Sequence, residues 1–188
     1  NTLDLNGHKL TVKGNLQQGR FGSLNINGGT LEVQGDYTII TYGYLKMTNA
    51  KDKVIVNGNF TTKSSSSHTG KLTDGTMEIK GDFNQISSDG SSVYNFNCTY
   101  NHKVIFNGTR KQVIHFDSTS SGFAKENFKN SNIEFDNNIR GWTLQEDTVI
   151  DNNLNLNLDS DINLNGHKLT VKGSLQQGGG TININGGT

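Results

Sequence analysis

The chain has 188 residues, of which 31% are hydrophobic and 23 are glycine, and its 17 basic residues balance 17 acidic ones. A net charge of zero gives no basic surface for a phosphate backbone, which argues against nucleic-acid binding. Cys98 is the only cysteine, so an intrachain disulfide and a zinc site built from paired thiolates are excluded. No apolar run reaches the length of a membrane span.

The apolar residues follow a strict short period. Two apolar residues separated by one residue, then one further residue and a glycine, form a motif that recurs along the whole chain. It begins at Leu3, Leu10, Leu24, Leu31, Val54, Met77, Val104, Ile162, Leu169 and Ile182. A period of two predicts short β-strands with one apolar face, and glycine tolerates the positive φ of a tight bend. Because a disordered chain has no reason for such periodicity, we predict an all-β fold.

The spacing of the motif predicts how the strands are arranged. Strand starts come in pairs seven residues apart, and a third apolar position follows the second glycine, as in Gly14-Asn15-Leu16 and Gly35-Asp36-Tyr37. The glycines at this corner are spaced by 21, 23 and 23 residues; they are Gly14, Gly35, Gly58 and Gly81. Three sides per turn predict a right-handed parallel β-helix, or β-solenoid, with three-sided coils of 21–23 residues.

Stacking of the coils at about 4.8 Å aligns equivalent positions of successive coils. We expect one internal column of Val12, Val33, Val56 and Ile79, and a second of Leu16, Tyr37, Phe60 and Phe83. Asp36 and Asp82 share a corner position two coils apart, where we expect their carboxylates to be solvated or to bond the turn backbone.

Four stretches interrupt or weaken the regular pattern. Serine runs predict polar loops near residues 63–75 and 85–102, and the corner pattern weakens at Gly108-Thr109-Arg110, which lacks the apolar third residue. An irregular insert is expected near residues 117–131. Its segment FAKENFKN is compatible with a short helix or an excursion, with Phe123 and Phe128 packing back on the coil.

A longer repeat overlies the short one. The fifteen residues Leu5–Gly19 recur at Leu164–Gly178, with only Asn15 replaced by Ser174. The chain is therefore expected to be a single β-solenoid fragment, residues 1–188, with one tandem block at 1–159 and the start of the next at 160–188. Because the coils of a solenoid contact only their neighbours, duplicated blocks continue the stack without a new interface, and length becomes the property that varies.

The glycine- and asparagine-rich coils resemble the repeat regions of secreted or surface-attached bacterial right-handed β-helix proteins, of which the filamentous-haemagglutinin-like adhesins are the nearest type. The resemblance covers most of the chain but rests on an architectural motif. It implies an extracellular rod at the bacterial cell surface that serves in adhesion or in a filament, and it carries over no catalytic residue.

Candidate chemistry is sparse. Polysaccharide lyases and hydrolases with β-helix folds need clustered acidic residues, whereas the acidic residues here are scattered, so we expect no enzyme activity and no catalytic residue. The five histidines form no metal-binding motif and are expected at corners or on the surface, and no metal or other cofactor is predicted. Aromatic residues in or beside irregular segments are candidates for stacking on sugar rings. They are Tyr42, Tyr44, Tyr94, Tyr100 and Trp142.

These observations favour a structural and adhesive rod or fibre at a bacterial surface. Its expected partners are further copies of itself, through tandem or head-to-tail stacking of blocks, and a polysaccharide or a host or neighbouring-cell surface. The alternative is a carbohydrate-binding β-helix module, which should lose binding when an exposed tyrosine or Trp142 is changed to alanine. A polysaccharide lyase or hydrolase is the third and least favoured function.

Overall fold

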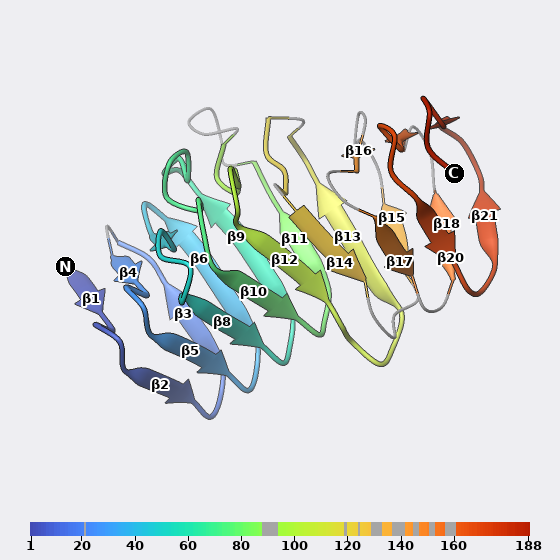
Figure 1. Cartoon of the computed structure of the whole chain (residues 1–188). Helices are drawn as coiled ribbons and strands as arrows, with labels where there is room; N and C mark the ends of the chain where they lie inside the picture. Colours follow the sequence, from blue (N-terminus) through green and yellow to red (C-terminus); the bar gives the residue numbers. More distant parts are fainter. Residues whose placement is uncertain are drawn as a thin grey trace.

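The computed structural model describes residues 1–20, 22–87, 94–118, 120–123, 125–128, 133–136, 142–144, 147–150, 153–156 and 161–188. These residues form short strands and no helix. The strands are parallel and stack into a β-solenoid of about seven turns, with the N-terminus at one end and the C-terminus at the other (Figure 1). The predicted all-β solenoid is confirmed.

The strands lie on three faces of the solenoid, which we number by their order along the first coil. The first face contains β1 (Thr2–Asp4), β4 (Ser23–Asn25) and β7 (Tyr44–Lys46), and later β16 (Trp142–Thr143), β19 (Ile162–Asn163) and β22 (Ile182–Asn183). The second face contains β2 (Lys9–Val12), β5 (Thr30–Val33), β8 (Lys53–Val56), β10 (Thr76–Ile79), β12 (Lys103–Phe106) and β14 (Lys125–Phe128), followed by β17 (Thr148–Ile150) and β20 (Leu169–Val171). The third face is one eight-stranded sheet of β3 (Leu16–Gln18), β6 (Tyr37–Thr41), β9 (Phe60–Ser64), β11 (Phe83–Gln85), β13 (Gln112–Phe116), β15 (Ile133–Asp136), β18 (Leu154–Leu156) and β21 (Leu175–Gln177).

The pairing register gives the length of each coil. On the second face Lys9 pairs with Thr30, Thr30 with Lys53, and Lys53 with Thr76, which are the steps that the motif spacing predicts. The next step, from Thr76 to Lys103, is longer. The predicted coil length therefore holds for the first coils, is exceeded at this one step, and holds again afterwards, where Lys103 pairs with Lys125 and Ile133 with Leu154.

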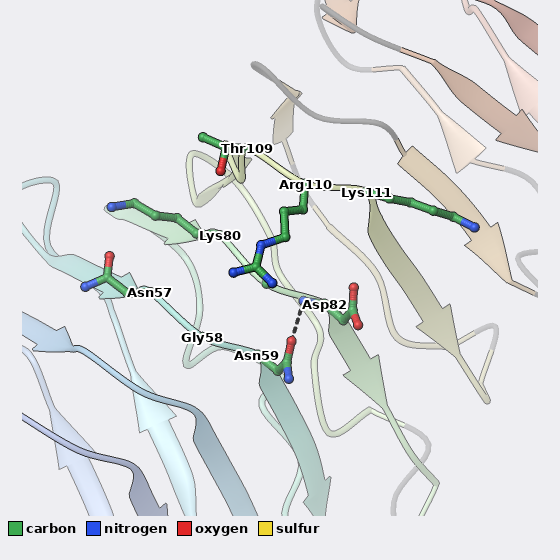
Figure 2. Close-up of a pocket in the computed structure, with 9 residues that line it drawn as sticks. Asn57, Gly58, Asn59, Lys80, Asp82, Thr109, Arg110 and Lys111 are labelled. Atoms are coloured by element: carbon green, nitrogen blue, oxygen red, sulfur yellow. Dashed lines mark hydrogen bonds between the residues drawn. The ribbon is translucent and has the colours of Figure 1, made fainter.

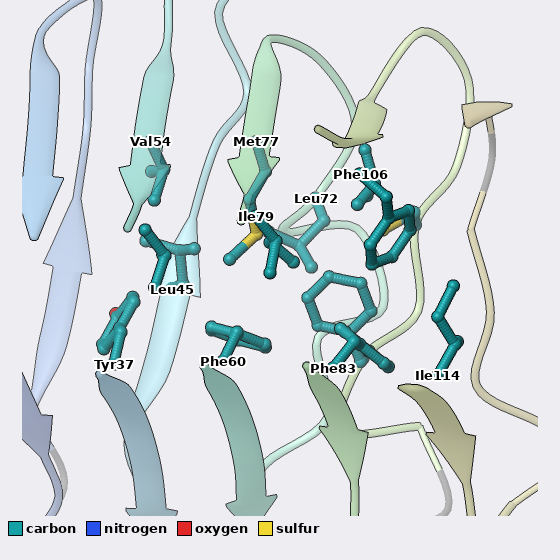
Figure 3. Packing of buried hydrophobic residues seen from close by; sticks show 14 of the residues in the cluster. Tyr37, Leu45, Val54, Phe60, Leu72, Met77, Ile79, Phe83, Phe106 and Ile114 are labelled. Atoms are coloured by element: carbon teal, nitrogen blue, oxygen red, sulfur yellow. The ribbon is translucent and has the colours of Figure 1, made fainter. Parts of the chain in front are cut away.

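Both predicted internal columns are present, and Figure 3 shows Tyr37, Phe60 and Phe83 of the second column side by side. Val12, Val33, Val56 and Ile79 are aligned by strand pairing, as are Leu16, Tyr37, Phe60 and Phe83. From the second coil onwards their side chains are fully buried. Tyr37 and Phe60 meet edge to face with ring centroids 5.4 Å apart, and Phe60 and Phe83 stack at 5.7 Å. Aligned aromatic rings thus add specific contacts to the burial of apolar area.

The segment that was compatible with a helix forms strand β14 instead. Strand pairing places Phe128 beside Phe106 in the inner column, where alternation rather than a helical period buries every second residue. Phe123 packs against the core as expected, with ring centroids 5.0 Å from Phe83 and 4.9 Å from Phe116. Phe83, Phe116 and Phe123 thus form an aromatic cluster at this level of the core.

The expected polar loop at residues 63–75 is only partly a loop. Ser64 belongs to β9 and is fully buried, and its Oγ donates a hydrogen bond to the Gly43 carbonyl. Leu72 is also buried and bridges Met47 on one side and Cys98 on the other, which continues the first face. Of the loop expected near residues 85–102, residues 88–93 lie outside the described part of the chain.

The corner glycines are of two kinds. Between the first and second faces, Asn6 and Gly7 both have positive φ, 46° and 80°, and Asn27-Gly28 repeats this geometry with 47° and 79°. Two consecutive positive φ values define a type I′ turn, for which Asn-Gly is the preferred pair. The corner between the second and third faces is different: Gly35, Gly58 and Gly81 do not have positive φ. The expectation that their role is to supply a positive φ is wrong for this corner.

Close stacking explains the glycines of this second corner. A Cβ atom at Gly58 would overlap the Asp36 Oδ1 atom and lie 2.7 Å from the Gly35 carbonyl of the coil before it. A Cβ atom at Gly81 would lie 2.6 Å from the Gly58 carbonyl. The Gly58 and Gly81 N–H groups donate to the carbonyls of the preceding glycines at 3.0 Å. Only a residue without a side chain fits where successive backbones meet so closely.

Candidate functional site

The residue after each of these glycines connects one coil to the next. The Oδ1 atoms of Asn15, Asp36, Asn59 and Asp82 each accept the backbone N–H of the equivalent place in the following coil, at 2.7–2.8 Å. Of the two alternatives expected for Asp36 and Asp82, solvation or a bond to the turn backbone, the backbone bond is present, but it goes to the following coil and not to their own turn. One oxygen of each carboxylate is used to hold the stack together.

The stacking of glycine on glycine is interrupted where the chain leaves the stack after Gly108, whereas the side-chain contact recurs farther along the chain, where Asn153 Oδ1 accepts the Ser174 N–H at 2.7 Å. The Gly108 N–H donates to Gln112 Oε1 at 2.9 Å, whereas the N–H groups of the earlier glycines donate to a glycine carbonyl of the coil before. Gln112 is fully buried, and its amide donates to the Ile79 and Gly81 carbonyls. The Gln112 amide thus replaces a missing backbone partner at this corner, and Thr109, Arg110 and Lys111 are left outside the stack.

These three residues cover one side of a polar pocket of about 380 Å³ (Figure 2). The remaining lining comes from two coils of the corner, at residues 57–59 and 80–82. Figure 2 shows the Arg110 side chain reaching from the loop toward Asn59 and Asp82, while Lys111 points away from them. The dashed line in the same view is the ladder hydrogen bond from the Asp82 N–H to Asn59.

The aromatic candidates do not gather into one site. Tyr42 and Tyr94 are 44% and 45% exposed and lie at the corner that follows the third face; their carbonyls accept hydrogen bonds from Ser66 and His68 of the coil between them. Tyr100 is 79% exposed but lies at the corner between the first and second faces, in a positive-φ turn. The Tyr44 ring is only partly exposed and has the Lys71 ammonium 4.7 Å from its centroid. The side chain of Trp142 lies outside the described part of the structure.

His68 and His102 are buried, so the expected surface position is wrong for both, although His102 lies in the corner turn before β12 as His8 lies in the turn before β2. The Leu45 N–H donates to His68 Nε2, and the His102 Nδ1–H donates to the Asp74 carbonyl. Their other ring nitrogens have no hydrogen-bond partner among the described residues. Burial lowers the pKa of His68 to about 3 and also lowers the pKa of His102, so both rings are neutral at pH 7.

The described residues contain no group of three or more histidine, cysteine, aspartate or glutamate side chains that could hold a metal ion. Within the same part of the chain, no helix is long and apolar enough to cross a membrane. Comparison with known proteins finds no matching family model, no matching curated protein and no matching solved structure. Function must therefore be inferred from the residues themselves.

No direct signal in the sequence marks the Arg110 pocket as a site. The weakened corner pattern at Gly108-Thr109-Arg110 indicates where the loop leaves the stack, but that pattern alone does not say which side chains it meets. Lys80 and Asn57 come from two earlier coils, and the strand register had to be known before they could be placed beside Arg110.

Proposed function

We propose that this chain is a segment of a structural and adhesive extracellular rod at a bacterial cell surface, built from tandem solenoid blocks. One observation carries the proposal: the repeated fifteen residues take the same elements near both ends of the stack. Leu16–Gln18 and Leu175–Gln177 are both third-face strands, and Asn165-Gly166 repeats the positive-φ turn of Asn6-Gly7. A following block would meet the same surface that the second coil meets in the first block.

The two ends have the chemistry that such stacking needs. Leu3, Leu175 and Ile184 are among the exposed large hydrophobic residues, at 53%, 48% and 56%. Suppose that the chain continued after Thr188 with the residues that follow Thr30. The added third-face strand would then cover Leu175, in the way that Tyr37 and Ile39 cover the end of the first coil. The Thr188 N–H already donates to the His167 carbonyl, as the Thr30 N–H donates to His8.

The test is a chain in which residues 31–188 follow Thr188 a second time. We expect one straight particle in electron microscopy and small-angle scattering, longer than the original by about 34 Å because seven coils rise about 4.8 Å each. Two particles joined by a flexible hinge would contradict the rod. For the surface location, antibodies against the chain should label intact cells of the producing bacterium, and labelling only after lysis would overturn that part.

A second function is favoured by the exposed tyrosines, namely carbohydrate binding along the solenoid. Tyr42, Tyr94 and Tyr100 present aromatic surface on which sugar rings stack. In a screen of neutral and acidic oligosaccharides, Tyr100→Ala should lose binding. Tyr44→Ala is the matched control, since the Tyr44 ring is already partly covered and meets the Lys71 ammonium.

A further inference from the structure

The corner pocket of Arg110 exists because the coil is interrupted at one point. At the earlier corners the glycine backbones stack directly on one another, and a ladder side chain of the coil before lies against each glycine. At Gly108 the chain departs, Gln112 takes over the hydrogen bonds, and the loop of residues 109–111 turns back over the corner. A buried amide with several hydrogen bonds anchors this loop, so the position of Arg110 is fixed at its base.

The charge of the pocket is predominantly positive. Lys80, Arg110 and Lys111 line it against one carboxylate, that of Asp82. Asp82 already accepts the Val113 N–H through one oxygen. Within the described part of the chain, neither Lys80 nor Arg110 forms an ion pair with a carboxylate, in contrast to Lys9 with Glu32 and Lys53 with Glu78. Two cations therefore remain available to an external anion.

The other lining groups restrict the class of that anion. None of the nine residues that line the pocket carries an aromatic ring or a large apolar side chain. A nucleobase, a lipid or an apolar peptide would find no complementary surface. Asn57, Asn59 and Thr109 instead supply amide and hydroxyl groups of the kind that bind sugar hydroxyls, and the glycine floor at Gly58 and Gly81 lets a ligand approach the backbone.

We propose that this pocket binds an acidic sugar, with the carboxylate or sulfate group held by Arg110, the ring hydroxyls held by the asparagine amides, and Lys80, whose ammonium points away from Arg110 in Figure 2, adding positive charge at the rim. The fork of a guanidinium matches the two oxygens of either acid group. A volume of about 380 Å³ lies in the range of small-ligand clefts and suits a short oligosaccharide. This site deepens the carbohydrate-binding proposal, but it lies on a different surface from the exposed tyrosines.

The experiment is calorimetric titration at low salt with four probes: a galacturonate oligomer, a sulfated galactose oligomer, a neutral galactose oligomer and poly-glutamate. We expect at least one acidic oligomer to bind and the neutral oligomer not to bind. Arg110→Gln should weaken that binding by about tenfold, and Lys80→Gln should independently weaken it to a smaller extent. Lys13→Gln is the matched control, since Lys13 occupies the same place as Lys80 at the first corner, where no loop lies above it, and it should bind as the parent does.

Asp82→Asn should change the affinity for the acidic oligomer in the opposite direction. Asparagine keeps the oxygen that the Val113 N–H needs, as Asn15 and Asn59 do in the same ladder. Loss of the negative charge should strengthen binding of the acidic oligomer roughly threefold at low salt, and this gain should shrink as salt is added. An unchanged affinity would show that the acid group does not bind in this pocket.

The outcomes separate this site from the broader proposal. Equal binding of neutral and acidic oligomers with loss only in Tyr100→Ala would support carbohydrate binding and overturn the Arg110 site. Binding of poly-glutamate as strongly as the sugars would overturn the sugar assignment. Absence of binding by every probe would overturn both. Thermal melts of each variant test whether it is folded. If Arg110→Gln is unstable, the affinity of Lys80→Gln for the acidic oligomer tests the site instead.

Discussion

Individual glycines decide how closely the coils approach. Gly58 and Gly14 occupy the same corner position, but among the residues that the structure describes only Gly58 of these two meets the backbone of another coil where its Cβ atom would lie. A Cβ atom at Gly14 would meet nothing within 4 Å. The same substitution therefore has opposite consequences at equivalent places in the repeat.

We expect Gly58→Ala to lower the free energy of unfolding by about 2 kcal/mol, since the new methyl group must displace the Gly35 backbone or the Asp36 side chain. Gly14→Ala should be neutral or stabilise by about 0.5 kcal/mol, because alanine restricts the unfolded chain. Urea titrations of the two variants measure the difference. An equal effect at both positions would show that contact between stacked corners is not the reason for glycine.

The buried histidines link stability to pH. His68 has a pKa of about 3 in the folded chain against 6.5 when exposed, so between these values the unfolded chain binds more protons. Stability is then fully present above about pH 6.5 and is lost as pH falls toward 3. Lowering the pH from 7 to 5 should cost about 2 kcal/mol from His68 alone.

His68→Gln tests this share of the pH dependence. A glutamine oxygen can accept the Leu45 N–H in place of Nε2 and does not titrate. Thermal melts between pH 7 and pH 5 should show a smaller drop for this variant than for the parent. His8→Gln, at an exposed position, is the control and should keep the parent's profile. Identical profiles for all three would contradict the assignment.

At the scale of the strand, the register of the third face differs by two residues from the register of the sequence repeat. In the sequence repeat, the counterpart of Leu16 is Leu175. In the structure, seven successive strand pairings instead align Leu16 with Gln177. The two-residue shift enters between Phe83 and Ile114, where the sheet passes from β11 to β13. An even shift keeps apolar side chains inside, so the core tolerates it.

Gln112 sits at this shift and compensates for the lost backbone partners. Gln112→Leu should fit sterically, because the following strands place Ile133 and Leu154 in the same column. It leaves the Gly108 N–H and the Ile79 and Gly81 carbonyls without the amide, so we expect a loss of about 2–3 kcal/mol in urea unfolding. The exposed Gln17→Leu is the control and should change stability by less than about 0.5 kcal/mol.

Strand positions were more predictable from the sequence than corner chemistry. The columns through Val33 and Phe60 follow from a period of two and a constant spacing, both of which are properties of the chain alone. The role of Gly58 depends on the coil before it, and the burial of His68 depends on loops whose path the repeat does not specify. For the same reason, contacts between coils of unequal length could not be predicted from the sequence. The Arg110 pocket is formed by such contacts.

At the scale of the whole molecule, the coil rather than the residue is the unit that can be removed. The inner strands of each sheet are paired with the strands of the coils before and after them, so a missing coil can be replaced by its neighbour. Thr30 and Lys53 are paired and follow equivalent turns. Removal of residues 30–52 would therefore join Gly29 to Lys53 and stack β8 on β2 with the inner column intact.

We expect this deletion of a whole coil to fold, with strand circular dichroism and a cooperative melt, because Val56 then meets Val12 and Phe60 meets Leu16 in the same columns. The smaller deletion of residues 30–41 removes about half a coil and should prevent folding, since it places second-face and third-face segments on the wrong sides. The larger deletion is thus the milder one. If the smaller deletion kept more structure, the coils would not be interchangeable units, and the case for a rod extended by whole blocks would lose its physical basis.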